Sequence, residues 1–117
     1  MEGKDTIGAS PPSPAMSVVA IVTAFPVPDH RTEVIRAFEA AIKQVHNEPG
    51  VELYALHEGT DRLVMIEKYA SAEARSAHRR GAALAGLRSA LEGKLCTELD
   101  VQVLAPHPAG NPQQGAL

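Results

Sequence analysis

Glu67, Tyr69 and His78 are the side chains of this sequence whose types and spacing best suit proton transfer. Glu67 and Tyr69 lie two residues apart in a strand-like run, so they point to one face of a sheet and can line one pocket. His78 follows in a helix-like stretch, four residues after Ala74, on the face that should pack toward the sheet. Imidazole can take a proton from a substrate hydroxyl near neutral pH, and a tyrosine hydroxyl can hold a substrate oxygen. We therefore predict catalytic roles for His78 as the base and for Tyr69 as the orienting donor.

Each of these three side chains also has an ordinary structural explanation. Tyr69 can be a core aromatic residue with its hydroxyl at the rim, because a buried tyrosine needs a hydrogen-bond partner in any case. Glu67 is a carboxylate in an apolar strand and can pair with a lysine or arginine at the sheet edge or at a subunit interface. A lone histidine on a packed helix face is often a satisfied structural residue. The residues alone leave both interpretations open.

Further substrate contacts are predicted around this group. Together with Glu67 they are Met65 on the same strand face, and Tyr54 and His57 on the strand before it. The five histidines show neither HxH nor HxxxH spacing, and the carboxylates are scattered among different elements. We therefore predict no metal site.

The elements that must position these residues follow from hydrophobic periodicity. Apolar runs and period-two alternation predict strands, and apolar residues at steps of three and four predict helices. The predicted strands cover 18–25, 51–58, 62–69 and 97–104, and the predicted helices cover about 29–48, 72–80 and 82–91. Ser71 is the expected cap of the second helix, which breaks at Gly81. The order β-α-β-β-α-β predicts a ferredoxin-like α+β domain with an antiparallel sheet and its helices on one face.

The strands carry apolar residues on both faces. The first strand is an almost wholly apolar run that fits burial on both sides, and the third offers Val64 and Ile66 opposite Leu63 and Met65. If helices cover one face, the other exposes an apolar surface in a monomer. We therefore predict a homodimer in which a second sheet covers that surface.

Composition narrows the class of protein further. A chain of 117 residues with 44% hydrophobic and 21% charged residues is typical of one globular domain. The net charge of -3 and a longest basic run of Arg79-Arg80 argue against a nucleic-acid partner, and no apolar run is long enough for a membrane span. The single cysteine, Cys96, fits a reducing cytoplasm. We expect the domain at 17–105, between a flexible leader at 1–16 and a flexible tail at 106–117.

Three segments resemble the antibiotic biosynthesis monooxygenase family. They are Glu48-Pro49-Gly50-Val51, the strand Leu63–Tyr69, and Ser71-Ala72-Glu73-Ala74 running on to Ala77-His78. Members of that family typically show a Pro-Gly or similar turn, a strand ending Glu-x-Trp/Tyr, and a helix with a His after a Ser/Glu/Ala start. The resemblance spans Val18 to Leu104, which is nearly the whole predicted domain.

The resemblance implies a dimeric α+β barrel with one cavity per subunit, between sheet and helices. It also implies oxygenation of phenolic or quinol-like aromatics by O₂ without metal, flavin or other cofactor, because an electron-rich phenolate can itself pass an electron to O₂. Arg88 resembles in position an arginine or histidine that contributes to the cavity in some relatives, so it joins the substrate contacts. A haem-degrading branch fits less well, because the first strand lacks its Asn and His78 takes the place of its Trp.

We therefore predict a cofactor-independent monooxygenase of a small phenolic, quinol or polyketide-like aromatic. Two alternatives stay open: a non-catalytic ligand-binding or stress-related dimer of the same fold, and an isomerase or lyase that uses the same base without O₂. An enclosed apolar pocket with converging polar groups would favour the enzyme. A filled interior around Met65, Tyr69 and His78 would favour the non-catalytic protein.

Overall fold

The computed structural model describes residues 17–117, so the predicted leader at 1–16 lies outside the described residues. The elements are β1 (Val18–Ala24), a 3-10 turn η2 (Pro28–His30), α1 (Arg31–Val45), β2 (Val51–Glu58), β3 (Leu63–Tyr69), α2 (Ala72–Arg79), α3 (Ala82–Leu91) and β4 (Asp100–Leu104). The first helix starts later than its periodicity predicts, because Pro28 opens a separate 3-10 turn ahead of it. The prediction of β-α-β-β-α-β, with the second helix broken in two, is confirmed.

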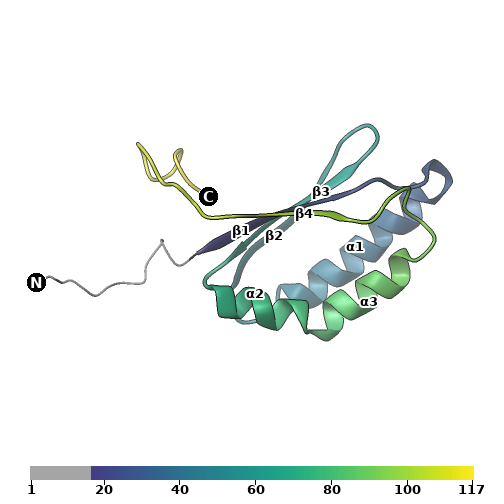
Figure 1. Cartoon of the computed structure of the whole chain (residues 1–117), viewed down its shortest axis with the longest axis horizontal. Coiled ribbons are helices and arrows are strands. Elements are labelled where there is room, and N and C mark those ends of the chain that lie inside the picture. The colour runs from purple at the N-terminus through teal and green to yellow at the C-terminus, as the bar shows by residue number, and fades with distance from the viewer. Residues whose placement is uncertain (1–16) are drawn as a thin grey trace, which may run out of the picture.

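The four strands form one antiparallel sheet in the order β2-β3-β1-β4. Figure 1 shows the sheet nearly edge-on, with α1, α2 and α3 together on one side of it. This is the predicted ferredoxin-like α+β arrangement. Within residues 17–117, the opposite face of the sheet has no helix packed on it.

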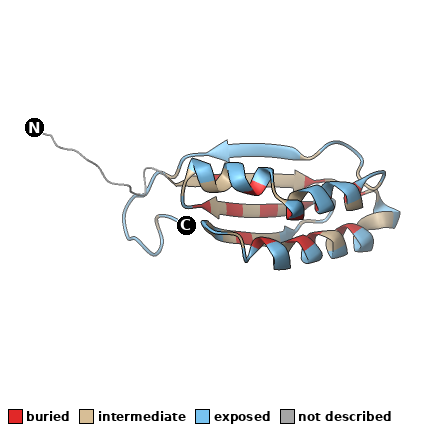
Figure 2. Ribbon diagram, turned by 90° about the horizontal axis from the view of Figure 1, so that it is seen from below, coloured by how far each residue is buried: buried red, intermediate tan, exposed pale blue. Residues whose placement is uncertain are grey.

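The core lies where α1 and α3 pack on each other and on the sheet. α1 buries one stripe at steps of four, three and four residues, consisting of Val34, Phe38, Ala41 and Val45. α3 buries Ala83, Leu87 and Leu91. Residues at this spacing share one helix face, which explains why charged residues of α1 remain on the outside. In Figure 2 the buried residues lie where the helices and the central strands face one another.

Ser71 and Gly81 delimit α2, the helix that carries His78. The Ser71 hydroxyl accepts a hydrogen bond from the Ala74 backbone N–H at 3.1 Å, so the predicted cap is confirmed. The backbone N–H of Gly81 donates a hydrogen bond to the His78 carbonyl at 3.0 Å, where the chain leaves α2 and turns into α3. A Cβ at Gly81 would lie 3.3 Å from that same carbonyl oxygen. The junction is therefore tight, and the absence of a side chain helps it form.

The two faces of β3 differ in burial. Leu63, Met65, Glu67 and Tyr69 are buried on the face that the helices cover, whereas Val64, Ile66 and Lys68 between them are half-buried on the other face. β1 repeats this pattern less strictly, since Val19 on the uncovered face is also buried. β4 is exposed along its whole length, as Figure 2 shows. Among residues 17–117, no helix combines the length and the apolar character that crossing a membrane would need.

Candidate functional site

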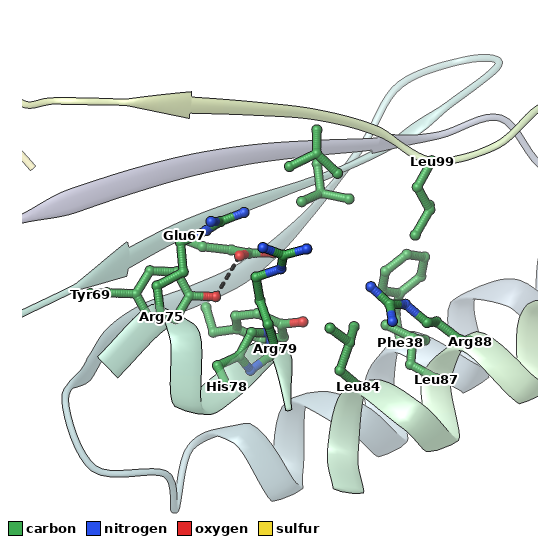
Figure 3. A pocket seen from close by; sticks show the side chains of 13 residues that line it. Phe38, Glu67, Tyr69, Arg75, His78, Arg79, Leu84, Leu87, Arg88 and Leu99 are labelled. Carbon is green, nitrogen blue, oxygen red and sulfur yellow. Dashed lines mark hydrogen bonds between the residues drawn. The ribbon is translucent and has the colours of Figure 1, made fainter. Parts of the chain in front are cut away.

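A cavity of about 150 Å³ lies between the covered face of the sheet and the helices α2 and α3 (Figure 3). Its polar lining comes from the strands, with Tyr54, Glu67 and Tyr69, and from α2, with His78. Apolar walls come from both layers, with Val22 from the sheet and with Phe38, Leu84 and Leu87 from the helices. The space is therefore a pocket in which buried polar groups stand beside hydrocarbon walls.

A register shift in β2 brings Tyr54 into this pocket. Val51 pairs with Tyr69, but Leu53 pairs with Lys68, so the ladder contains an irregularity between Val51 and Leu53. Side chains alternate between faces, and one extra residue exchanges the faces for the rest of the strand. The shift places Tyr54 directly opposite Glu67, on the covered face.

Tyr69 and Glu67 form a buried hydrogen-bonded pair. The Tyr69 hydroxyl donates to Glu67 Oε1 at 2.6 Å, and the Glu67 residue is only 5% exposed (Figure 3). Burial raises the pKa of Glu67, while the Tyr69 hydrogen bond and the charges of His78 and Arg75 oppose that rise. Burial and the neighbouring Glu67 charge raise the pKa of Tyr69. Tyr69 therefore keeps its proton, directs it at Glu67, and has hydroxyl lone pairs left to accept a hydrogen bond.

His78 is buried between the two tyrosine rings. It is 4% exposed. Its ring centroid lies 5.2 Å from that of Tyr54, in an edge-on arrangement, and 5.6 Å from that of Tyr69. Burial raises the pKa of Tyr54 as well, with smaller contributions from the charges of Glu67 and Glu48. Both tyrosines are therefore neutral hydroxyl groups at neutral pH, so the candidates for accepting a proton there are the His78 imidazole and the Glu67 carboxylate.

Glu48 holds the His78 ring from outside the cavity. His78 Nδ1 lies 2.8 Å from Glu48 Oε1. In the neutral imidazole, a proton on Nδ1 donated to this carboxylate leaves Nε2 as an acceptor. Nδ1 is therefore occupied by Glu48, and Nε2 is the nitrogen available for a ligand.

Gly50 sets the position of Glu48 beside α2. Gly50 adopts φ +80°, which favours glycine, and a Cβ built on it would lie 2.6 Å from the Ala74 Cβ. Its carbonyl accepts a hydrogen bond from the Ala70 N–H at 2.8 Å. The turn after α1 therefore packs directly against α2, and a larger residue at Gly50 would push Glu48 and His78 apart.

Three arginines line the pocket from the helix side. Arg75 and Arg79 come from α2 and Arg88 from α3, and Figure 3 shows their side chains extending from the helices toward the space below the sheet. Arg75 is half-buried, while Arg79 and Arg88 are exposed. The buried polar groups thus mark the inner end of the pocket, and the exposed arginines mark its open end.

The structure brings together five of the seven predicted site residues. Tyr54, Glu67, Tyr69, His78 and Arg88 all line the cavity. Met65 does not line it and instead packs within the hydrophobic core. His57 does not line it either: it pairs with Val64, on the uncovered face of the sheet. Glu67 pairs with Tyr69 rather than with a lysine or arginine at the sheet edge.

Three charged residues of the site were not predicted from the sequence. They are Glu48, Arg75 and Arg79. Arg75 lies three residues before His78, so helical spacing could have placed it on the same face. Glu48 belongs to the Pro-Gly turn segment, but it is 30 residues from His78 in the sequence. Within the described part of the chain, no group of three or more His, Cys, Asp or Glu side chains is arranged to hold a metal ion.

Fold and site together define a ferredoxin-like α+β protein with a small half-polar pocket between its sheet and its helices. The family model for antibiotic biosynthesis monooxygenase matches residues 17–88. The chain belongs to the antibiotic biosynthesis monooxygenase family.

Several solved structures share this fold. Rv0793 from Mycobacterium tuberculosis is 29% identical, with a TM-score of 0.76 over 81% of this chain and 99% of that one. A candidate antibiotic biosynthesis monooxygenase from Nitrosomonas europaea is 19% identical, with a TM-score of 0.74 over 78% of this chain and 90% of that one. PA3566 from Pseudomonas aeruginosa is 20% identical, with a TM-score of 0.72 over 80% and 97% of the two chains. The last two likenesses concern the fold alone. No curated protein matches the sequence.

Proposed function

We propose that the protein is a cofactor-independent monooxygenase that oxidises a small phenolic or quinol-like aromatic with O₂. The observation that carries this proposal is His78: it is buried at the inner end of the cavity, with Nδ1 at Glu48 and its ring between two tyrosines. Family membership supports the reaction class. The single cysteine suits a reducing compartment, so we place the enzyme in the cytoplasm.

His78 acts as the general base in this proposal. Its Nε2 takes the proton from a substrate hydroxyl, and Glu48 keeps the ring in the required tautomer. Because the Tyr69 hydroxyl donates its own proton to Glu67, it does not donate to that substrate oxygen, and Tyr69 instead packs beside the His78 ring. Tyr54 contributes a second neutral hydroxyl on the same face of the sheet. The product of this step is a phenolate inside a cavity with largely apolar walls, where water competes little for its charge.

The phenolate then reduces O₂ directly. One electron passes to O₂, and the resulting superoxide and phenoxyl radical combine at a ring carbon that bears hydrogen. The peroxide receives the proton held by His78, and loss of water across its O–O bond, with the ring C–H proton, gives a quinone. One oxygen atom of O₂ enters the quinone and the other leaves as water. The substrate supplies all the electrons, so the balance needs no other reductant.

We further propose that the protein is a homodimer joined through the uncovered face of the sheet. That face carries Ile21, Val64 and Ile66, which no helix covers. An apolar surface of this kind favours association with a like surface, and a two-fold dimer lets one patch pair with itself. Light scattering should give a molar mass of twice 12.4 kDa.

Oxygen uptake tests the proposal. Purified protein is mixed with a panel of hydroquinones, single-ring phenols and anthrone-like compounds, and an oxygen electrode follows the rate above that of buffer. At least one compound should be oxidised. His78→Asn should lower that rate by about 100-fold to 10,000-fold, the usual contribution of a general base.

A matched control separates chemistry from folding. His107 lies exposed in the C-terminal segment, away from the cavity, so His107→Asn should leave the rate unchanged. Failure of every compound to be consumed would contradict the enzyme and favour the non-catalytic binding protein. Turnover that proceeds equally well without O₂ would favour the isomerase or lyase.

A further inference from the structure

The charge of the cavity is opposite to that of the whole chain. The protein carries a formal net charge of -3. The cavity lining nevertheless contains three arginines and only one carboxylate, that of Glu67. Guanidinium groups around a pocket of this size raise the local concentration of an anionic ligand and lower that of a cationic one. The lining therefore favours a negatively charged ligand.

The three arginines do not have the same role. The charge of Arg75 acts on Glu67, where it favours the ionised carboxylate. Arg79 and Arg88 lie at the open end, and among residues 17–117 neither belongs to an ion pair, because the pairs found there involve other side chains. Arg75 is thus partly compensated by a protein group. Arg79 and Arg88 are the two guanidinium groups available to a ligand.

The size of the cavity limits what can fill it. Its volume is about 150 Å³. A cavity of about that volume in an engineered protein core accommodates benzene. One aromatic ring therefore fills the enclosed space, and any substituent opposite the inner end reaches the exposed arginines. A ligand of several fused rings would extend out of the cavity past its open end.

We infer that the cavity takes a single aromatic ring that carries both a hydroxyl and a carboxylate. The hydroxyl lies at the inner end, by His78 and Tyr69, and the carboxylate lies at the open end, between Arg79 and Arg88. The planar guanidinium fork suits a planar carboxylate. The reverse orientation would bring the carboxylate against Glu67, and two like charges in a buried site are unfavourable. This inference rests on the proposed function, since it names the substrate class of the same site.

Calorimetric titration without O₂ tests the inference separately from the chemistry. Three matched rings are compared: 2,5-dihydroxybenzoate, the neutral 2,5-dihydroxybenzamide, and 1,4-dihydroxybenzene, which lacks the group. The carboxylate should bind about tenfold or more tightly than either neutral ring, the range expected for charge-assisted hydrogen bonds to exposed arginines. Raising the salt concentration should weaken binding of the carboxylate alone.

Variants locate the carboxylate. Arg79→Gln and Arg88→Gln should each raise its Kd by roughly fivefold to tenfold and leave the Kd of 1,4-dihydroxybenzene unchanged. Arg36→Gln removes an exposed arginine of α1 that is not part of the cavity lining, so it is the control and should change neither Kd.

Equal affinity for the three rings, or equal loss with Arg36→Gln, would overturn the inference. Tighter binding of 4-hydroxyphenyl phosphate than of the carboxylate would overturn it in favour of a phosphorylated ligand. Binding of the carboxylate without any oxygen uptake would leave this inference supported and contradict the proposed function. Oxidation of neutral rings, without tighter binding of the carboxylate, would support the proposed function and contradict this inference.

Discussion

The two faces of the sheet differ in the side chains that they carry: the covered face holds a group of buried polar residues, and the uncovered face holds apolar residues outside the core. The covered face buries Glu67, Tyr69 and Tyr54 beneath the helices, together with His78. The uncovered face presents Ile66 and its apolar neighbours where no helix reaches them. Stability alone favours neither feature, because burying polar groups is costly unless they are well satisfied and apolar side chains outside the core forgo the benefit of burial. The difference supports the two proposals that the covered face binds a ligand and that the uncovered face binds a second copy of the chain.

A charge on the uncovered face should have the largest effect. Ile66→Glu would place two carboxylates in the proposed dimer interface, one from each copy. Each unpaired buried charge costs about 3–5 kcal/mol, so the dimer constant should weaken by roughly a thousandfold or more. Light scattering should then report a monomer whose circular dichroism still shows the fold. A dimer that persists in this variant would exclude the uncovered face as the interface.

The preceding residue, Met65, lies on the other face and should behave differently. Met65→Ala removes a side chain from the core and should lower the free energy of unfolding by about 2–5 kcal/mol. The loss should be the same in the monomeric Ile66→Glu background as in the wild type. Urea unfolding measures it in both. If Met65→Ala caused no loss in the free energy of unfolding in the monomeric background, Met65 would stabilise the protein through dimerisation rather than through the core.

Replacement of the buried carboxylate should change how stability depends on pH. The folded state raises the pKa of Glu67 above its unfolded value, so the folded chain holds this proton more tightly than the unfolded chain does. The contribution of Glu67 to the free energy of unfolding of the wild type therefore falls as pH rises from the unfolded pKa through the raised folded pKa. Glu67→Gln lacks this titration. Its free energy of unfolding, relative to that of the wild type, should therefore rise by on the order of 1–3 kcal/mol over this pH window and then stay constant.

Urea unfolding of both proteins from pH 4 to pH 8 measures this difference. Glu33 provides the control, because it is exposed on α1 and its pKa is lowered by His30. Glu33→Gln should not gain on wild type as pH rises. A constant gap between Glu67→Gln and wild type would show that burial does not hold the proton of Glu67.

The smallest expected effect concerns the start of α2. Ser71→Ala removes the oxygen that accepts from the Ala74 N–H and should cost about 1 kcal/mol. Ser76→Ala, at an exposed position inside the same helix, should cost little or nothing. Thermal unfolding of the two variants compares them. Equal melting temperatures would show that packing alone fixes the helix that carries His78.

The elements of the fold could be predicted from the sequence because each has a local physical cause. The stripe of Val34, Phe38 and Val45 needs a helix of 3.6 residues per turn, and the hydroxyl of Ser71 marks where the next helix starts. The expected homodimer stays a prediction. The boundaries that moved, at η2 and at the start of β4, depend on backbone turns that periodicity does not describe.

The site could be predicted only in part, because its residues meet through tertiary contacts. Alternation correctly placed Glu67 and Tyr69 on one strand face, but the register shift in β2 decides that Tyr54 enters the pocket. The partner of His78 comes from Glu48, across a turn whose close packing requires Gly50. No local pattern links Glu48 to His78. A histidine in the sequence can be recognised as a candidate base, but the carboxylate that orients it cannot.

Isotope labelling of the oxidised product tests the central claim most directly. The protein is supplied with ¹⁸O₂ in ordinary water and with whichever aromatic compound it oxidises. We expect one ¹⁸O atom in the quinone and one in water, with both signals lost in His78→Asn. A quinone without label, with the oxygen recovered as hydrogen peroxide, would contradict a monooxygenase at this cavity.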